Sequence, residues 1–314
     1  MRTTFQKTKE RGAVKKKIVG AFTILRPTQW LKNIFLFAPL IFSKHLFEAI
    51  YFWREVLAFV CFCFVSSIVY VVNDIADREA DKLHPVKRNR SLASGLLRLS
   101  DAVIVILMLL AFVLSLTPYL SLPFWYTIAF YGILNIAYSF WLKQIVIVDV
   151  FIIAAGFMLR ILAGVFAIEV VISSWLVLCT LFVSLFLAVS KRRGELMLST
   201  ATDSYASRPV LKQYDVSFMD QIMTVAASGM AISYALYTVA ERTVTIYGTE
   251  NLVFTTVFVL FGIFRYLFLM RGRKTDDNPM HLLLSDVPLV VNILLWFLAC
   301  VFIIYYHETA KWIF

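Results

Sequence analysis

The stretch 53-WREVLAFVCFCFVSSIVYVVNDIADREAD-81 joins a long apolar run directly to a cluster of acidic residues. Residues 53–74 are mostly apolar, and a helix that spans a membrane needs roughly 20 such residues. The acidic cluster begins where this run ends, which places it at the mouth of a transmembrane helix. The segment therefore predicts a membrane helix with a carboxylate-rich end.

The whole chain has a composition that agrees with this segment. Of its 314 residues, 61% are hydrophobic and only 16% are charged, and the mean hydropathy is +0.79. A soluble globular protein is about 45–50% apolar and about 25% charged. The composition therefore excludes a soluble enzyme, a disordered chain and a disulfide-rich secreted scaffold. The four cysteines lie inside apolar runs, which predicts buried thiols without disulfides. We predict an all-α polytopic membrane protein.

Nine apolar stretches are long enough to span a bilayer. They cover residues 19–42, 53–74, 100–119, 122–141, 146–167, 172–190, 220–240, 251–270 and 287–307. The basic tail at residues 1–17 resembles the start of a signal peptide, but the apolar stretch after it is too long, so we expect a retained first span. The prediction is a single transmembrane domain, residues 18–314, with about nine helices around a central cytoplasm-facing cavity. Residues 76–99 and 191–219 are expected to form its cytoplasmic cap.

Basic residues are distributed unevenly between the two sides of these spans. With the N-terminus inside, 22 of the 30 Lys and Arg residues lie in inner segments and four lie in outer segments. Basic residues gather in the cytoplasmic loops of membrane proteins. We therefore predict an inner (cytoplasmic) membrane protein with a cytoplasmic N-terminus, an outside C-terminus and an active site that faces the cytoplasm. The net charge of +10 belongs to these loops, so it favours anionic ligands and does not indicate nucleic acid.

Three carboxylates follow the second span at positions i, i+3 and i+7, namely Asp74, Asp77 and Asp81. On a continuous helix they lie on one face, within about 60° of one another. Like charges at this spacing repel, so we expect a cation among them. Sparse, hard oxygen ligands suit Mg²⁺ or Mn²⁺, and the basic run at residues 87–90 supplies groups for phosphate. The alternative is a solvated acidic helix end that neighbouring basic residues neutralise.

Four segments resemble one known family. The pattern N-D-x-x-D-x-x-x-D at residues 73–81 resembles the motif that holds Mg²⁺ in the UbiA-type superfamily of intramembrane prenyltransferases. Residues 26–33 (RPTQWLKN), 81–90 (DKLHPVKRNR) and 138–143 (the pattern Y-S-x-x-x-K) are similar to its decaprenyl-phosphate phosphoribosyltransferase branch. The resemblance extends over roughly residues 24–200 and is specific because the four segments occur together.

The resemblance implies an activity and a site. The activity is transfer of 5-phosphoribose from 5-phosphoribosyl 1-diphosphate to a polyprenyl (decaprenyl-like) phosphate, with release of diphosphate. In the site, Asp74, Asp77 and Asp81 would hold Mg²⁺ on the diphosphate. The residues expected to bind substrate are Lys32, Asn33, Asn73, Lys87, Arg88, Arg90, Tyr138, Lys143, Asp149, Arg160, Lys191, Arg192 and Glu195.

One departure from the family pattern separates this activity from its alternatives. Many members that use prenyl diphosphates carry a second D-x-x-x-D motif after the sixth span, whereas residues 190–195 here read SKRRGE. Basic groups at that place fit a substrate that presents its phosphate to Lys191 and Arg192. A prenyltransferase that moves an isoprenoid to an aromatic or other acceptor remains the alternative enzyme. A transporter for an anionic solute is disfavoured, because no repeat is visible and glycines number only 11.

Ionisable residues inside predicted spans are costly and usually face the interior of a bundle. On the fifth span, Asp149, Gly156, Arg160 and Gly164 lie within about 80° of one another. Arg160 lies about 16 Å beyond Asp149 along the helix, so it cannot easily reach the inner surface. It either contacts phosphate from the cavity wall or pairs with a buried acid or carbonyl groups. Arg265 has no polar neighbours on its own helix face, and we predict a structural role for it.

Overall fold

A computed structural model describes residues 17, 19–83, 87–171, 173–201, 209–272 and 279–310. Its regular structure in these residues is entirely helical. Most of the predicted tail (1–17), parts of the predicted cap (84–86 and 202–208) and the last four residues lie outside the described residues.

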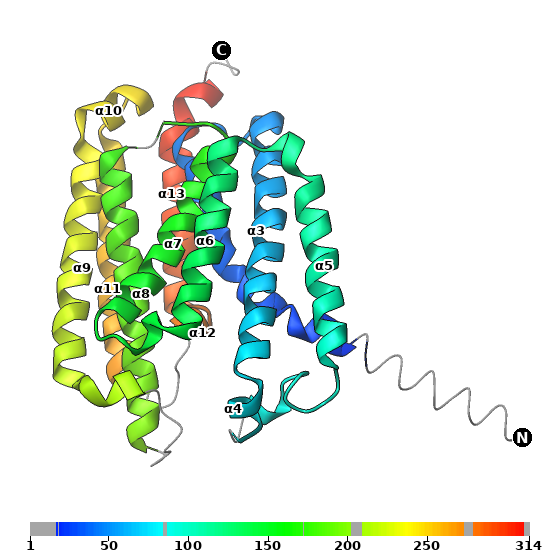
Figure 1. Ribbon diagram of the computed structural model, residues 1–314. Helices are drawn as coiled ribbons and strands as arrows, with labels where there is room; N and C mark the ends of the chain where they lie inside the picture. Colours follow the sequence, from blue (N-terminus) through cyan, green and yellow to red (C-terminus); the bar gives the residue numbers. More distant parts are fainter. Residues whose placement is uncertain are drawn as a thin grey trace, which may run out of the picture.

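Eight long helices run side by side (Figure 1). They are α3 (Ala49–Ala76), α5 (Leu99–Ser115), α6 (Leu122–Phe140), α7 (Val148–Ala167), α8 (Ser174–Ala201), α9 (Val216–Val239), α11 (Thr256–Gly272) and α13 (Val287–Ala310). Each coincides with one predicted span. Seven segments of the described chain are long and apolar enough to cross a membrane, and α6 packs beside two of them, α3 and α7. The protein is therefore a multi-span integral membrane protein.

Shorter helices connect the long ones. The α-helical connections are α2 (Ala38–Phe42), α4 (Arg78–Leu83), α10 (Glu241–Tyr247) and α12 (Pro279–Ser285). The 3₁₀ helices are η1 (Pro27–Phe37), η2 (Lys87–Asn89), η3 (Thr117–Tyr119), η4 (Leu142–Gln144), η5 (Pro209–Gln213) and η6 (Asn251–Thr255). Helices α4 and α10 lie at opposite ends of the bundle (Figure 1). Helix α8 continues past the predicted end of its span at residue 190, so the predicted cap at 191–219 begins as helix.

The first predicted span, residues 19–42, is not one continuous helix. Residues 19–24 are helical, Arg26 adopts a left-handed conformation with φ of 51°, and η1 and α2 follow. Pro27 explains the break, because proline lacks an amide hydrogen and disfavours the right-handed α conformation at the residue before it. The broken segment runs obliquely across the bundle in blue (Figure 1), packed against α3 and α7. A ninth regular crossing helix is therefore not confirmed.

Small residues and buried thiols complete the packing. At Gly164 of α7, an added Cβ would lie 2.2 Å from the Leu36 carbonyl oxygen of η1 and 2.5 Å from Glu55 Oε1 of α3. Only glycine lets η1 approach α7 this closely. The cysteines are free and buried, as predicted. Arg265 pairs with Asp286 at 2.8 Å, which agrees with its predicted structural role.

We expect Gly164→Ala to destabilise the protein and Gly132→Ala on α6 to stabilise it. Overpacking against backbone costs typically 1–3 kcal/mol. At Gly132 an added Cβ meets nothing within 4 Å, and alanine is favoured over glycine in a helix by about 1 kcal/mol. Thermal unfolding in detergent measures both changes. Equal shifts of the unfolding temperature in Gly164→Ala and Gly132→Ala would contradict the close contact between η1 and α7.

Candidate active site

The three carboxylates of the acidic cluster, Asp74, Asp77 and Asp81, stand on either side of a helix break. Helix α3 ends at Ala76, Asp77 caps it with φ of −88° and ψ of 2°, and α4 then carries Asp81. The prediction of one continuous helical face is therefore wrong. The Asn73 amide donates a hydrogen bond to Asp77 Oδ2 at 3.2 Å, which links Asp77 to the last turn of α3.

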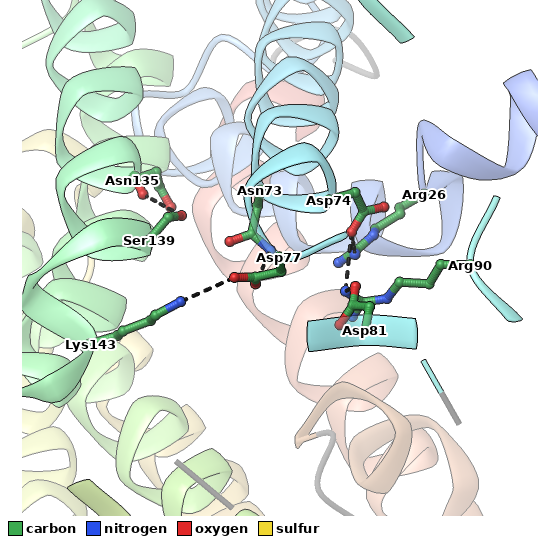
Figure 2. Close-up of polar contacts among 9 residues, drawn as sticks. All are labelled: Arg26, Asn73, Asp74, Asp77, Asp81, Arg90, Asn135, Ser139 and Lys143. Carbon is green, nitrogen blue, oxygen red and sulfur yellow. Dashed lines mark hydrogen bonds and ion pairs between the residues drawn. The ribbon is translucent and has the colours of Figure 1, made fainter. Parts of the chain in front are cut away.

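Each carboxylate of the acidic cluster has a cationic partner (Figure 2). Arg90 Nη1 lies 3.1 Å from Asp74 Oδ1 and 2.6 Å from Asp81 Oδ2, so one guanidinium joins two acids. Arg26 donates a second hydrogen bond to Asp74. Lys143 Nζ, from η4 after α6, lies 3.4 Å from Asp77 Oδ1. The positive charge expected between the carboxylates is supplied here by the protein itself.

The carboxylate oxygens of two of the three acids are suitable ligands for a divalent cation. Among the described residues, no three acidic, histidine or cysteine side chains come together in a way that would hold a metal. Asp74 and Asp81, however, already flank one cationic atom, Arg90 Nη1. Mg²⁺ is commonly bound by one or two carboxylates and completed by waters and substrate phosphates. The pair of acids suits that ion once Arg90 leaves, and Asp77 is held apart by Lys143.

A second group of charges surrounds Arg192 of α8, whose side chain is fully buried. Its Nε lies 2.8 Å from Asp149 Oδ2 of α7, at an angle that forms an ion pair without a hydrogen bond. It also donates hydrogen bonds to Glu195 and to the Tyr138 hydroxyl. Lys191 lies 3.9 Å from Glu195 and remains one-third exposed. Arg192 is therefore bound by protein groups, and Lys191 is the more accessible cation.

Tyr214 completes this group from the segment before α9. Its hydroxyl donates to Asp149 Oδ1 at 2.6 Å and accepts from the Ile147 backbone N–H at 2.5 Å. Burial, and then the hydrogen bond to the Asp149 carboxylate, raise the pKa of Tyr214 above its usual range. The phenol therefore stays protonated and serves as the donor that Asp149 needs.

Arg160 lies deeper in the bundle and is almost completely buried. Its guanidinium donates to Asn33 Oδ1 at 2.8 Å, to the Gly156 carbonyl at 2.5 Å and to the Tyr131 hydroxyl at 3.0 Å. Three aromatic rings lie 5.1–5.5 Å from its central carbon, those of Phe62, Tyr131 and Phe157. All of its partners within the described residues are neutral, so this buried charge has no counter-ion there and favours an anion nearby.

Comparison with known proteins places this arrangement in a family. The model of the UbiA prenyltransferase family matches residues 34–285, which contain the acidic cluster, Arg160 and Arg192. The chain belongs to the UbiA prenyltransferase family.

Two relatives in the UbiA family are similar over nearly their whole length. A decaprenyl-phosphate phosphoribosyltransferase of Corynebacterium glutamicum is 34% identical over 96% of this chain and 92% of the relative. A protein of the same name from Mycolicibacterium smegmatis is 31% identical over 91% of this chain and 92% of the relative. These matches confirm the resemblance that the sequence motifs indicated.

The fold is that of solved UbiA homologues. A homologue from Archaeoglobus fulgidus, bound to GPP and Mg²⁺, aligns with a TM-score of 0.66 and 17% identity over 91% of this chain and 99% of that chain. At this identity the likeness concerns the fold alone. It confirms the predicted class of all-helical membrane fold.

This UbiA family member brings most of its predicted site residues into three groups. The acidic cluster gathers Asn73, Arg90 and Lys143; the Arg192 group gathers Tyr138, Asp149, Lys191 and Glu195; and Asn33 joins Arg160. Lys32 is half-buried next to Asn33, Lys87 is half-buried in η2, and Arg88 is exposed there. Their binding of substrate stays a prediction.

Three residues of these groups were missing from the predicted site. Arg26 stands in the RPTQWLKN segment, so the sequence held a signal for it. Tyr131 lies two helical turns before the predicted Tyr138, so it is on the same helix face, but the sequence alone does not separate it from an aromatic residue of the core. Tyr214 has no motif around it, and only the folded structure brings its hydroxyl to Asp149.

Proposed function

We propose that this protein transfers 5-phosphoribose from 5-phosphoribosyl 1-diphosphate to a polyprenyl phosphate. A phosphate oxygen of the lipid would attack C1 of the ribose, and the bond from C1 to the diphosphate oxygen would break. The observation that carries the proposal is the 34% identity, over 96% of this chain, to a relative named for phosphoribosyl transfer to decaprenyl phosphate. Lys191 also supports it, since it offers an accessible cation where a second acidic motif would hold metal.

In this proposal the acidic cluster and its basic partners bind the donor's diphosphate. Asp74 and Asp81 would hold Mg²⁺, or Mn²⁺, when Arg90 turns from them to the diphosphate. The bound cation supplies charge to the leaving diphosphate. Arg26 lies against Asp74 and Lys143 lies against Asp77, and both would donate charge-assisted hydrogen bonds to the leaving diphosphate. The presence of Mg²⁺ in a solved UbiA homologue supports this assignment.

The Arg192 group would orient the lipid phosphate. Lys191 is exposed enough to contact the lipid phosphate. The buried Arg192 side chain holds Tyr138, Asp149 and Glu195 in place. A phosphate monoester is already ionised near neutral pH, so the nucleophile needs no general base. We assign none.

An assay with purified protein tests the function. Labelled 5-phosphoribosyl 1-diphosphate, polyprenyl phosphate and Mg²⁺ or Mn²⁺ should produce a labelled lipid, and excess chelator should abolish the product. Full turnover in chelator would refute the metal assignment. Formation of product from a prenyl diphosphate and an aromatic acceptor, with none from the sugar donor, would establish the alternative prenyltransferase activity.

We also propose that the acidic cluster faces the cytoplasm from an inner membrane, with an outside C-terminus. The unequal distribution of Lys and Arg residues supports this orientation. The four native cysteines are buried, so single introduced cysteines report their own side. Arg88→Cys in η2 should react with an impermeant thiol reagent only from the cytoplasm, and Glu241→Cys in α10 only from outside. Labelling of both variants from one side would contradict the topology.

A further inference from the structure

Helix α6 carries a strip of polar side chains between the acidic cluster and Arg160. Tyr131, Asn135 and Ser139 are spaced by four residues, so they lie along one helix face. The Tyr131 hydroxyl accepts from Arg160 at 3.0 Å at the deep end of the strip. Lys143, just beyond the shallow end, lies 3.4 Å from Asp77. The strip therefore connects the two places where the site carries positive charge.

Asn135 and Ser139 lie opposite the acidic cluster. Figure 2 shows both on α6, at about the height of Asn73 and Asp77 on the neighbouring helix. Helices α3 and α6 pack against each other, and both polar side chains are half-buried. A substrate whose diphosphate lies at the acidic cluster would thus have its adjoining part within reach of this strip.

The two side chains keep hydrogen-bonding capacity for a ligand. Asn135 Nδ2 donates to the Tyr131 carbonyl at 2.8 Å, and Ser139 Oγ donates to the Asn135 carbonyl at 2.9 Å. Within the described part of the chain, Asn135 Oδ1 and Ser139 Oγ accept no hydrogen bond. Acceptors left open at membrane depth are costly unless a polar ligand or water meets them.

We propose that Asn135 and Ser139 form a subsite for the hydroxyl groups of the donor sugar. This inference rests on the proposed function and names the part of the donor that the strip recognises. Ribose hydroxyls can donate hydrogen bonds to amide and hydroxyl oxygens. A prenyl chain has no such group and would leave both acceptors unsatisfied. The subsite therefore selects a sugar diphosphate over a prenyl diphosphate.

The test compares donors that differ by one hydroxyl. Asn135→Leu and Ser139→Ala remove the acceptors, and Thr127→Val is the matched control, because Thr127 makes a similar bond to the Pro123 carbonyl two turns away on α6. Each protein is assayed with 5-phosphoribosyl 1-diphosphate and with its 2-deoxy and 3-deoxy analogues. With the complete donor, Asn135→Leu should lower kcat/KM about 10- to 100-fold, as for loss of a hydrogen bond to a substrate hydroxyl. The KM for polyprenyl phosphate and the activity of Thr127→Val should not change.

The analogues separate recognition of the sugar from a purely structural role. Wild type should have a much lower kcat/KM on the analogue that lacks the contacted hydroxyl than on the complete donor. For Asn135→Leu, kcat/KM on that analogue should differ from its value on the complete donor by less than about threefold, because the contact is already lost. Equal losses by Asn135→Leu on all three donors, or no loss on any of them, would overturn the subsite while the activity of wild type upholds the proposed function. A wild type that is inactive with the complete sugar donor would overturn both.

Discussion

Replacing Asp74 with asparagine should reduce turnover about 10³-fold while the protein still folds. This change corresponds to about 4 kcal/mol of lost transition-state stabilisation, the size expected when the charge on a leaving group is no longer neutralised. Asp74 is the residue to test because it is buried and contacts both Arg26 and Arg90. Steady-state kinetics with the sugar donor, at several Mg²⁺ concentrations, measures the loss. The concentration of Mg²⁺ needed for half-maximal rate should rise.

Glu79→Gln is the matched control for Asp74→Asn. Glu79 lies on α4 between Asp77 and Asp81, but its side chain is exposed and pairs with Lys82 at 2.7 Å. The hydrogen bond from Lys82 holds the pKa of Glu79 below its usual range, so this carboxylate is ionised like its neighbours. Its removal should leave turnover unchanged. Similar losses in both variants would show that only the total charge of the segment matters.

Replacing Arg192 with methionine should destabilise the protein by about 3–5 kcal/mol, the usual result when one member of a buried ion pair is removed. Arg192 and Asp149 are both fully buried, so the remaining carboxylate would have no counter-ion among the described residues. Thermal unfolding in detergent should show a much lower transition temperature. Arg193→Met should lower the stability less than Arg192→Met does, because the Asp220 carboxylate that loses its partner is partly exposed.

A double variant distinguishes lost charge compensation from lost packing. Asp149→Asn keeps an acceptor for the Tyr214 hydroxyl and removes the charge. Adding it to Arg192→Met should restore part of the stability, because the uncompensated carboxylate is gone. A double variant as unstable as the sum of the two single variants would show that the pair contributes through packing alone.

Length and apolar composition were enough to predict eight of the helices, since roughly 20 apolar residues have few other stable arrangements. The break at Arg26 was not predicted, although Pro27 marks it, because the residues around it are as apolar as those of a regular span. The acidic motif located one half of the candidate site. The burial of Arg192 could not be predicted, because its partners Asp149 and Tyr138 come from two other helices, far from it in the sequence. The same reason hid the contact of Arg160 with Asn33.

Arg90, shared between Asp74 and Asp81, would make metal and donor binding cooperative if both bind as proposed. A cation can bind between the two acids only when the guanidinium leaves, and the guanidinium leaves most readily toward an anion. A diphosphate would draw Arg90 away more readily when a bound cation replaces it beside Asp81, because Asp74 keeps Arg26 but Asp81 would lose its partner. Each ligand therefore lowers the free-energy cost of binding the other, and the coupling must be reciprocal. We expect free Mg²⁺ and free donor each to bind weakly alone and tightly together.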